Sequence, residues 1–438
     1  MGSATFKGGI HPYDGKELSM DRPIRTLLPK DEVVFLMSQH IGAPATPTVA
    51  VNDKVLVGQI IGAATGFISA NVVSSVSGTV KAIEPRQAVN GDKVNAIIVT
   101  NDHEYTTVED FGKKRDYTRL SKEQIRNIIK DAGIVGMGGA GFPTHVKMTP
   151  KDDDKIEYVI VNGAECEPYL TSDYRMMMEE PERIVNGLKI ILSLFTRAKG
   201  VIAIEDNKPE AIEKLSKMVR NNPSIEVCPL KTKYPQGGER SLIYAVTGRK
   251  VNSSMLPADV GCVVSNIDTT ISIGMAVSES TPLIRRIVTV TGDAIAEPCN
   301  YNVRIGMSYR EVLEAAGGLT GPVEKIISGG PMMGMALFSL DVPVAKTSSA
   351  LLCLKEDEAT KPESACIRCG RCATVCPGHI IPQKAADAAM HDDLEGFIKY
   401  DGLECCECGC CTYVCPAGRN LTQALKQMRK KALASRKK

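Results

Sequence analysis

The sequence CIRCGRCATVCP at residues 366–377 and its near repeat CCECGCCTYVCP at residues 405–416 decide the fold of the C-terminal region. Each run contains cysteines in the spacing C-x2-C-x2-C-x3-C and ends with a proline. With this spacing, successive thiolates can wrap one face of a 4Fe–4S cluster. Zinc sites instead pair two CxxC knuckles and do not repeat a four-cysteine run that ends in proline. The runs therefore predict two 4Fe–4S clusters rather than two zinc sites.

In runs of this spacing, the fourth cysteine ligates the cluster of the other run, which divides the cysteines into two sets. The first set is Cys366, Cys369, Cys372 and Cys415, and the second set is Cys405, Cys408, Cys411 and Cys376. Cys406 and Cys410 break the spacing, and we expect them to pack beside a cluster. The helical pattern between the runs predicts a helical twin-cluster ferredoxin-like domain over residues 360–420. A basic helix and tail follow at residues 421–438.

The composition supports a globular chain in a reducing compartment. Of the 438 residues, 43% are hydrophobic and 24% are charged, and the net charge is +2. Aromatic residues are only 5% and tryptophan is absent, which argues against a nucleic-acid-binding protein. The sequence shows neither an apolar run long enough to span a membrane nor a secretory signal, so we expect an intracellular protein. Clustered cysteines in such a compartment are typical of metal ligands.

The remaining sequence predicts a multidomain α/β chain. Residues 1–40 are an N-terminal extension, and residues 41–110 have short β-branched runs between glycine turns, typical of a small all-β module. This module resembles a barrel-sandwich hybrid, but it lacks the lysine of carrier domains, so we interpret it as structural. Helices alternate with apolar strands over residues 115–285, beginning with a capping box at Ser121 and Gln124, which indicates an α/β domain. Residues 286–354 form a separate compact α+β unit.

Residues 136–141, GMGGAG, match the pattern G-x-G-x-x-G. A dinucleotide-binding fingerprint follows a strand and opens a helix, whereas this loop follows a predicted helix. Consecutive glycines nevertheless let main-chain N–H groups approach a phosphate or a flavin closely. From spacing alone, a cofactor loop and a tight interdomain turn are equally good interpretations.

Four segments in the same order resemble the FMN-carrying, NADH-oxidising subunit of respiratory complex I. GGAGFPTHVK at residues 138–147 resembles its GGAGFPTGLK loop, and NGAECEP at residues 162–168 resembles NADESEP. YPQGGE at residues 234–239 resembles YxxGEE, and VSNIDT at residues 264–269 resembles VNNVET. The departures are Met137, Ala164, Gly238 and Ser265, where that family has charged or amide side chains.

Nearly the whole chain resembles a narrower family, the RnfC proteins of the Rnf ion-translocating electron transport complex. The likeness includes the opening FKGGIHP at residues 6–12, the barrel-sandwich segment, the flavin-type segments and both cysteine runs. It implies a barrel-sandwich-like domain, a flavoprotein-like FMN- and NADH-binding α/β domain, a β-grasp domain of the soluble-ligand-binding type, and the ferredoxin-like domain.

The resemblance also implies a cofactor site with non-covalent FMN and NAD(H) as substrate. Residues around the flavin and its phosphate are Gly138, Gly139, Gly141, Lys147, Asn162, Glu165, Asn266 and Thr269. Tyr234, Gly237 and Glu239 line the flavin from the other side, and Phe142 and Glu167 contact the nicotinamide nucleotide. No catalytic acid–base pair or nucleophile is expected, because the cofactors supply the chemistry.

The implied function is that of an ion-translocating oxidoreductase subunit on the cytoplasmic side of a bacterial cell membrane. It would exchange hydride with NAD(H) through FMN and pass single electrons through two 4Fe–4S clusters. Its partners would be the other members of a membrane complex, including a ferredoxin-like subunit, which couple electron flow to Na+ or H+ translocation. One alternative is a flavin and iron–sulfur cobalamin reductase, but the roughly 110 residues before Ser121 favour the RnfC family. A second is a non-catalytic electron-wire adaptor, which the departures at Met137 and Ala164 favour.

Overall fold

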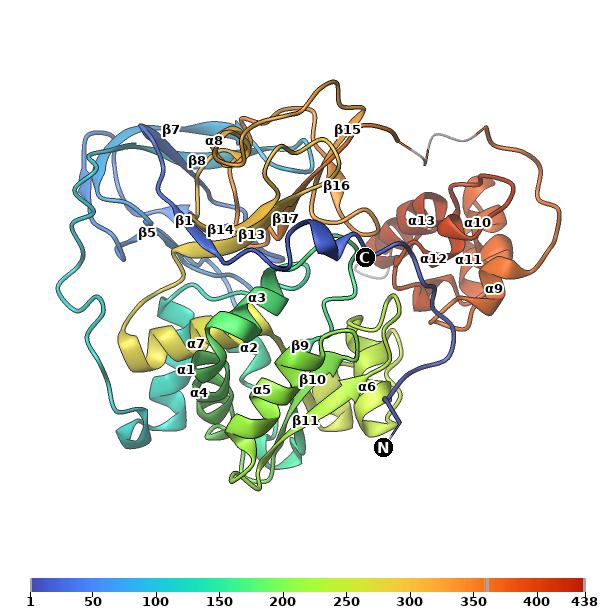
Figure 1. The fold of residues 1–438 in the computed structure, drawn as a ribbon, viewed down its shortest axis with the longest axis horizontal. Coiled ribbons are helices and arrows are strands. Elements are labelled where there is room, and N and C mark those ends of the chain that lie inside the picture. The colour runs from blue at the N-terminus through green and yellow to red at the C-terminus, as the bar shows by residue number, and fades with distance from the viewer. Residues whose placement is uncertain (1, 358, 360–361, 436–438) are drawn as a thin grey trace.

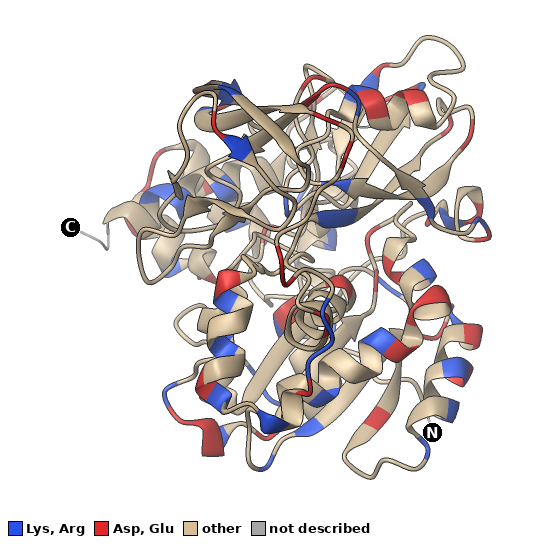
Figure 2. Ribbon diagram, turned by 90° about the vertical axis from the view of Figure 1, so that its left-hand side faces the viewer, with Lys and Arg blue, Asp and Glu red and all other residues tan. Residues whose placement is uncertain are grey.

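The computed structural model describes residues 2–357, 359 and 362–435, which fold into four units (Figure 1). Two β-rich units lie above a helix-covered parallel sheet, and the cysteine-rich unit lies to one side of both. Both signs of charge are interspersed along the ribbon (Figure 2), as expected for a net charge of +2. No helix in the described ranges is long and apolar enough to cross a membrane.

The first unit, called here the two-sheet unit, packs a four-stranded sheet against a three-stranded sheet. The first sheet has the order β2 (Glu32–Leu36), β8 (Lys93–Asn101), β7 (Gly78–Gln87) and β4 (Lys54–Val55). The second has the order β3 (Thr46–Pro47), β5 (Ile60–Ala63) and β6 (Val72–Val73). Alternate residues such as Val33, Phe35, Ile97 and Val99 face inward and form its core, as a period of two requires.

The structure corrects the expected boundary between the N-terminal extension and this module. Strand β2 lies within the supposed extension, yet it pairs along its whole length with β8. Strand β1 (Arg25–Leu27), also in the extension, pairs with β14 of a different sheet. Residues 1–40 therefore contribute strands to two units. The sequence does not indicate this, because long-range pairing leaves no signal in the local sequence.

The second unit, the parallel-sheet unit, has the strand order β11 (Ile225–Leu230), β10 (Lys199–Glu205), β9 (Tyr158–Gly163) and β12 (Cys262–Asn266). All these pairs are parallel, as the alternation of helices and strands predicts. Its helices are α1 (Lys122–Asp131), α2 (Thr144–Lys147), α3 (Ser172–Glu179), α4 (Pro181–Leu192), α5 (Pro209–Val219), α6 (Glu239–Thr247) and α7 (Ile267–Glu279). The predicted capping box at Ser121 is confirmed, since its hydroxyl accepts from Gln124 N and the Gln124 side chain accepts from Ser121 N.

The third unit, the mixed-sheet unit, has the strand order β1-β14-β13-β17-β15-β16. Its strands are β13 (Arg285–Thr291), β14 (Cys299–Arg304), β15 (Lys325–Ser328), β16 (Met335–Ala336) and β17 (Ala350–Leu354), with helix α8 (Tyr309–Ala315). A buried core around Val288, Tyr301, Tyr309 and Leu351 holds α8 to the sheet.

The fourth unit, the cysteine unit, is helical. It contains α9 (Arg371–Thr374), α10 (Pro382–Met390), α11 (Leu394–Lys399), α12 (Cys410–Tyr413) and α13 (Leu421–Ser435). Phe397, Leu403 and Leu425 pack with Cys376, Cys405 and Cys411 in one buried cluster. The last residues of the predicted basic tail, 436–438, lie outside the described residues. Short 3-10 turns occur at Lys16–Leu18, Tyr117–Arg119, Asp153–Lys155, Pro257–Val260 and Gly402–Glu404.

Candidate flavin and iron–sulfur site

The glycine-rich loop lies between α1 and α2, and the N-terminus of α7 anchors its base. Met137 N donates to Thr269 Oγ1 at 3.0 Å, and Asn266 caps α7 by accepting from the main-chain N–H groups of Asp268 and Thr269. Gly138 and Gly139 are exposed beyond this anchor. A helix N-terminus beside exposed main-chain N–H groups favours an anion such as a phosphate.

The glycines of the loop differ in their surroundings. A Cβ at Gly139 would meet nothing within 4 Å, so the main chain is open to a ligand there. A Cβ at Gly138 would meet Asn266 at 3.0 Å. Gly141 has φ +73° and is buried, and a Cβ there would lie 2.8 Å from Thr347. Gly141 therefore packs against the mixed-sheet unit and does not share the open face of Gly138 and Gly139.

The loop after β9 faces the start of α6. Asn162 Nδ2 donates to Gly237 O at 2.9 Å, and Gly237 N donates to Cys166 Sγ at 3.2 Å. Two of the predicted flavin-lining segments, residues 162–168 and 234–239, are therefore in direct contact. The contact holds Asn162 directly against Gly237.

Carboxyl groups are concentrated in this region. Glu165 accepts from the main-chain N–H groups of Asp173 and Tyr174, and Asp173 accepts from Asn266 Nδ2 at 2.8 Å. The surrounding protein raises the pKa of Glu165 by desolvation, which the nearby positive charge of Lys16 opposes. Desolvation, followed by the negative charge of Glu165, also raises the pKa of Asp173 well above its usual value. Both residues keep partial solvent access.

Glu167 is held by a loop of the mixed-sheet unit. Its Oε1 accepts from Met332 N at 2.7 Å and from Met333 N at 3.0 Å, and desolvation raises its pKa. A Cβ at Gly330 would meet Glu167 Cγ at 2.2 Å, so only glycine fits at that close approach. Glu167, a predicted nucleotide contact, is therefore hydrogen-bonded to the loop at residues 330–333.

Two further predicted cofactor residues, Phe142 and Lys147, follow the glycine-rich loop. Lys147 Nζ donates to Glu239 Oε1 at 2.9 Å and to Val264 O at 3.1 Å. Phe142 is half-buried, and its carbonyl accepts from Gly136 N at 2.8 Å. Lys147 and Glu239 are thus paired at the outer rim of the site.

The departures from the complex I pattern have a packing explanation. The side chains of Met137 and Ala164 are buried, and each belongs to a hydrophobic cluster of the parallel-sheet unit. Ser265 is buried and contacts the Thr270 hydroxyl at 2.9 Å. These positions contribute apolar packing or internal hydrogen bonds here, while the main-chain N–H of Met137 still supports the loop.

The first cysteine set surrounds one pocket. Cys366, Cys369, Cys372 and Cys415 all line it, together with Gln383, Arg371 and Arg419. Cys366 and Cys369 are exposed, and the neighbouring Ile367 is 66% exposed. Thiolates from both runs around one pocket suit a 4Fe–4S cluster that faces the outside of the molecule.

The second set lies deeper. Cys376, Cys405 and Cys411 are buried in one cluster, and Cys408 is half-buried. Burial raises the pKa of the Cys405 thiol to about 12. Cys406 is exposed and Cys410 is buried against Tyr234, with its thiol 3.9 Å from the Tyr234 carbonyl.

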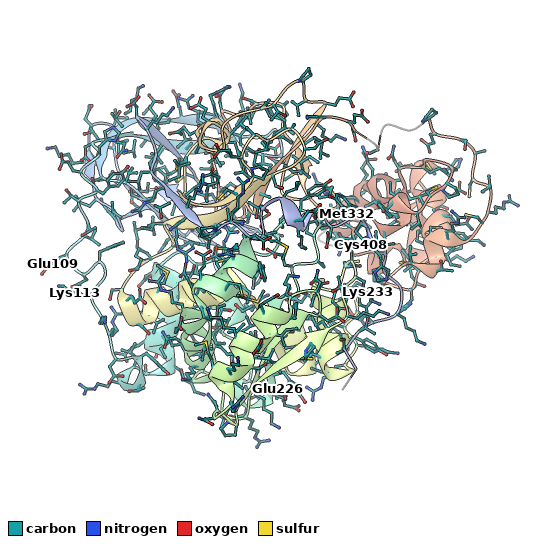
Figure 3. All side chains as sticks on the ribbon, in the orientation of Figure 1. Glu109, Lys113, Glu226, Lys233, Met332 and Cys408 are labelled. Carbon is teal, nitrogen blue, oxygen red and sulfur yellow. The ribbon has the colours of Figure 1, made fainter. Side chains whose placement is uncertain are left out.

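The flavin-type segments contact the second cysteine set. Tyr234 is buried, and its hydroxyl donates to Cys408 O at 2.8 Å. Met332, from the loop that holds Glu167, lies 3.1 Å from the Cβ position of Gly409. Figure 3 shows Met332, Cys408 and Lys233 along this boundary between three units.

Two residues near the site, Lys16 and Gln236, are not indicated by any sequence motif. Lys16 is buried and donates to Leu170 O at 2.5 Å and Glu167 O at 3.1 Å, but its segment carries no recognisable pattern. Gln236 lies inside the YPQGGE segment, is fully buried, and has no partner for either side-chain atom among the described residues. A buried amide without a protein partner beside the candidate site suits hydrogen bonding to a flavin.

Family models match most of the chain. A Nuo51 FMN-binding domain matches residues 129–275, and an RnfC barrel-sandwich hybrid domain matches residues 4–104. An SLBB domain matches residues 287–336, and a 4Fe-4S binding domain matches residues 359–381, which include the first cysteine run. These matches confirm the expected barrel-sandwich and FMN-binding domains and the 4Fe–4S cofactor type. The roles of individual residues stay predictions.

Comparison with known proteins gives the family. The C subunit of the proton-translocating ferredoxin:NAD(+) oxidoreductase complex of Clostridium ljungdahlii is 45% identical over 89% of this chain and 85% of its own length. The C subunit of the Na(+)-translocating complex of Acetobacterium woodii is 42% identical over 99% of this chain and 98% of its own. A chain of an NAD+-reducing [NiFe]-hydrogenase is 18% identical with a TM-score of 0.49, over 64% of this chain and 54% of its own. The chain belongs to the family of the C subunits of the ion-translocating ferredoxin:NAD+ oxidoreductase complexes.

Proposed function

We propose that this chain is the NAD(H)-reacting, electron-transferring subunit of a membrane complex that couples ferredoxin:NAD+ oxidoreduction to Na+ or H+ translocation. Two relatives of similar length are named as subunits of complexes with that activity. When bound, FMN exchanges two electrons as a hydride with NAD(H) and exchanges single electrons with iron–sulfur clusters. The protein supplies the binding, the orientation and the spacing of the cofactors.

The observation that carries this proposal is the contact between the candidate flavin site and the second cysteine set. Tyr234 belongs to a flavin-type segment, and its hydroxyl bonds to the main chain of Cys408, a predicted cluster ligand. This contact supports two-electron and one-electron chemistry side by side within one chain. A cluster domain without this contact would support only the electron-wire alternative.

The residues have separate roles in the proposed site. The open main chain of Gly138 and Gly139, beside the N-terminus of α7, binds the flavin phosphate. The hydrogen bond between Asn162 and Gly237 joins the two flavin-type segments and fixes their separation beside the flavin. The Phe142 ring and the Glu167 carboxylate orient the nicotinamide nucleotide.

We propose that the chain acts on the cytoplasmic face of the membrane and is held there by its partner subunits. The relatives are named as subunits of complexes, which supports partners that include a ferredoxin-like subunit. The match of residues 4–104 to the RnfC barrel-sandwich domain favours this function over the cobalamin reductase alternative.

Anaerobic titration of the purified, reconstituted chain with NADH tests the proposal. We expect stoichiometric bleaching of the flavin absorbance, followed by reduction of the clusters. Full cluster and flavin occupancy without any bleaching by NADH would contradict the proposal and leave the electron-wire alternative. Cobalt reduction in added cob(III)alamin at a rate above that of ferredoxin would instead favour the cobalamin reductase.

A further inference from the structure

The N-terminal motif FKGGI has no role in the proposed cofactor site, yet it lies between that site and the second cysteine set. We call residues 6–10 the N-terminal strap. In Figure 1 this dark blue segment rises from the edge of the parallel-sheet unit and passes beside the cysteine unit. On one side Gly9 N donates to Val375 O at 2.8 Å. On the other, Ile10 and Tyr234 exchange two main-chain hydrogen bonds of 2.8 and 2.9 Å.

The main chain of the strap approaches neighbouring carbonyl groups so closely at Gly8 and Gly9 that a side chain would not fit. Gly8 and Gly9 have φ of +86° and +84°, values that disfavour any residue with a side chain. A Cβ at Gly8 would lie 3.1 Å from the carbonyl oxygen of Cys376, a predicted ligand of the second cluster. A Cβ at Gly9 would lie 2.7 Å from Tyr234 O. The strap therefore touches a cluster ligand and a flavin-lining residue with successive residues.

Lys233 fixes the strap from the parallel-sheet unit. Its ammonium group donates to Phe6 O and to Gly8 O, and it lies 3.9 Å from the centre of the Phe6 ring. Both carbonyls belong to the first three residues of the strap, so one buried cation holds this part of it to the parallel-sheet unit. An arginine could retain the charge and the donors, whereas a methionine retains only the length.

Other contacts hold the second cysteine set to the same place. The Tyr234–Cys408 hydrogen bond and the Met332–Gly409 contact join the second run to the flavin-type residues. Ile10, Tyr234 and Cys410 form a small buried cluster with Met332 and Val375 packed against it. By contrast, the pocket of the first set is lined within the cysteine unit, and its Cys366 and Cys369 are exposed.

We infer that the N-terminal strap and Lys233 hold the cluster of Cys376, Cys405, Cys408 and Cys411 at a fixed separation from the flavin, and that this cluster exchanges electrons with the flavin directly. The cluster of Cys366, Cys369, Cys372 and Cys415 then serves the external redox partner. The inference rests on the proposed function. Each hydride taken from NADH releases NAD+ and delivers two electrons, which cross to the second-set cluster one at a time, while the proton leaves to solvent.

Electron transfer slows exponentially as two centres separate. If the strap positions the second cluster, loosening the strap should therefore slow cluster reduction. We compare Lys233→Met, Lys233→Arg and wild type, all as the full chain with both clusters and FMN, by stopped-flow absorbance. In Lys233→Met we expect NADH to bleach the flavin at the wild-type rate and cluster reduction to slow at least tenfold. Lys233→Arg should recover most of that loss. Cluster reduction at the wild-type rate in Lys233→Met would overturn the role of the strap.

A second pair of variants tests which cluster faces the flavin. Cys376→Ala removes a ligand of the second cluster, and Cys366→Ala removes a ligand of the first. We expect the remaining cluster to be reduced rapidly after NADH addition in Cys366→Ala and at least tenfold more slowly in Cys376→Ala. The reverse order would overturn the assignment. Cys408→Ala replaces Cys376→Ala if that variant does not fold.

A structural readout separates this inference from the proposed function. Hydrogen–deuterium exchange of residues 6–10 and 233–237 reports the strap without any turnover. We expect at least fivefold faster exchange there in Lys233→Met and near wild-type exchange in Lys233→Arg. If NADH fails to bleach the wild-type flavin, the proposed function fails while this measurement still tests the strap. Unchanged exchange in Lys233→Met would overturn the strap whatever NADH does.

Discussion

The Tyr234 hydroxyl donates a hydrogen bond to the main-chain carbonyl of Cys408 at 2.8 Å. Tyr234 comes from a segment of the parallel-sheet unit that resembles a flavin-binding motif, and Cys408 comes from the second cysteine run. The bond therefore spans the boundary between the two kinds of cofactor domain. The predicted flavin site and the predicted ligands of the second cluster meet at this hydrogen bond.

Replacing Tyr234 by phenylalanine should loosen this boundary. The buried carbonyl of Cys408 loses its donor, which costs about 1 kcal/mol and corresponds to about fivefold faster local opening. Hydrogen–deuterium exchange of the peptide at residues 405–415 measures the change. Tyr413→Phe is the matched control because Tyr413 is 55% exposed. Equal exchange in the two variants would contradict the importance of the bond.

Replacing a predicted ligand and replacing a non-ligand cysteine of the second run should have different effects on the iron content of the chain. Cys408→Ala removes a predicted ligand, so we expect iron to fall from about eight to about four atoms per chain. Cys406→Ala removes the thiol of an exposed residue that lies outside the spacing, and the variant should retain about eight. Iron analysis of anaerobically purified protein measures both. A loss of iron in Cys406→Ala alone would show that the register of the second run is misassigned.

An added methyl group should block the open part of the glycine-rich loop. A Cβ at Gly139 meets no protein atom within 4 Å, so Gly139→Ala leaves the fold intact while filling space beside the main-chain N–H groups. We expect FMN affinity to fall at least about tenfold, or about 1.4 kcal/mol. Fluorescence titration with FMN provides the value, and Gly321→Ala, also without close neighbours, is the control. Equal affinity of the two variants would place the phosphate elsewhere.

Lys346 should make the stability of the folded chain depend on pH. Its ammonium group is buried and donates to the carbonyls of Asn71 and Gly133, and burial lowers its pKa to about 7. An unfolded lysine keeps its proton up to about pH 10.4, so between these values the unfolded chain binds one more proton than the folded chain. Stability of the wild type relative to Lys346→Met should therefore rise with pH above 7, by up to about 1.4 kcal/mol per unit.

Urea unfolding of both proteins from about pH 6 to pH 10 measures that difference. Below pH 7 the lysine is charged in both states, so the difference between the proteins should level off. A difference that stays flat over the whole range would show that Lys346 remains protonated in the folded chain.

The sequence predicts local motifs well because their chemistry is local. The cysteine spacing indicates the cofactor type, and the capping box at Ser121 marks where α1 begins. Contacts between distant segments leave no such pattern. The pairing of β1 with β14 joins residues 25–27 to residues 301–303, and nothing in either segment specifies the other.

The same limit applies to the site. Glu167 is recognisable from the NGAECEP segment, but its partners at residues 332 and 333 come from another unit. Lys16 contacts the same segment from an undistinguished stretch near the N-terminus. The paired glycines at residues 8 and 9 are visible in the sequence, yet only the structure shows that they face Cys376 and Tyr234. Long-range packing, rather than composition, decides these positions.

The content of flavin and iron in the anaerobically purified chain tests the central claim most directly. The account predicts about one FMN and about eight irons per chain, with the flavin bleached by NADH. About eight irons with no flavin, even after incubation with FMN, would contradict hydride exchange at this site and leave a chain that only conducts electrons.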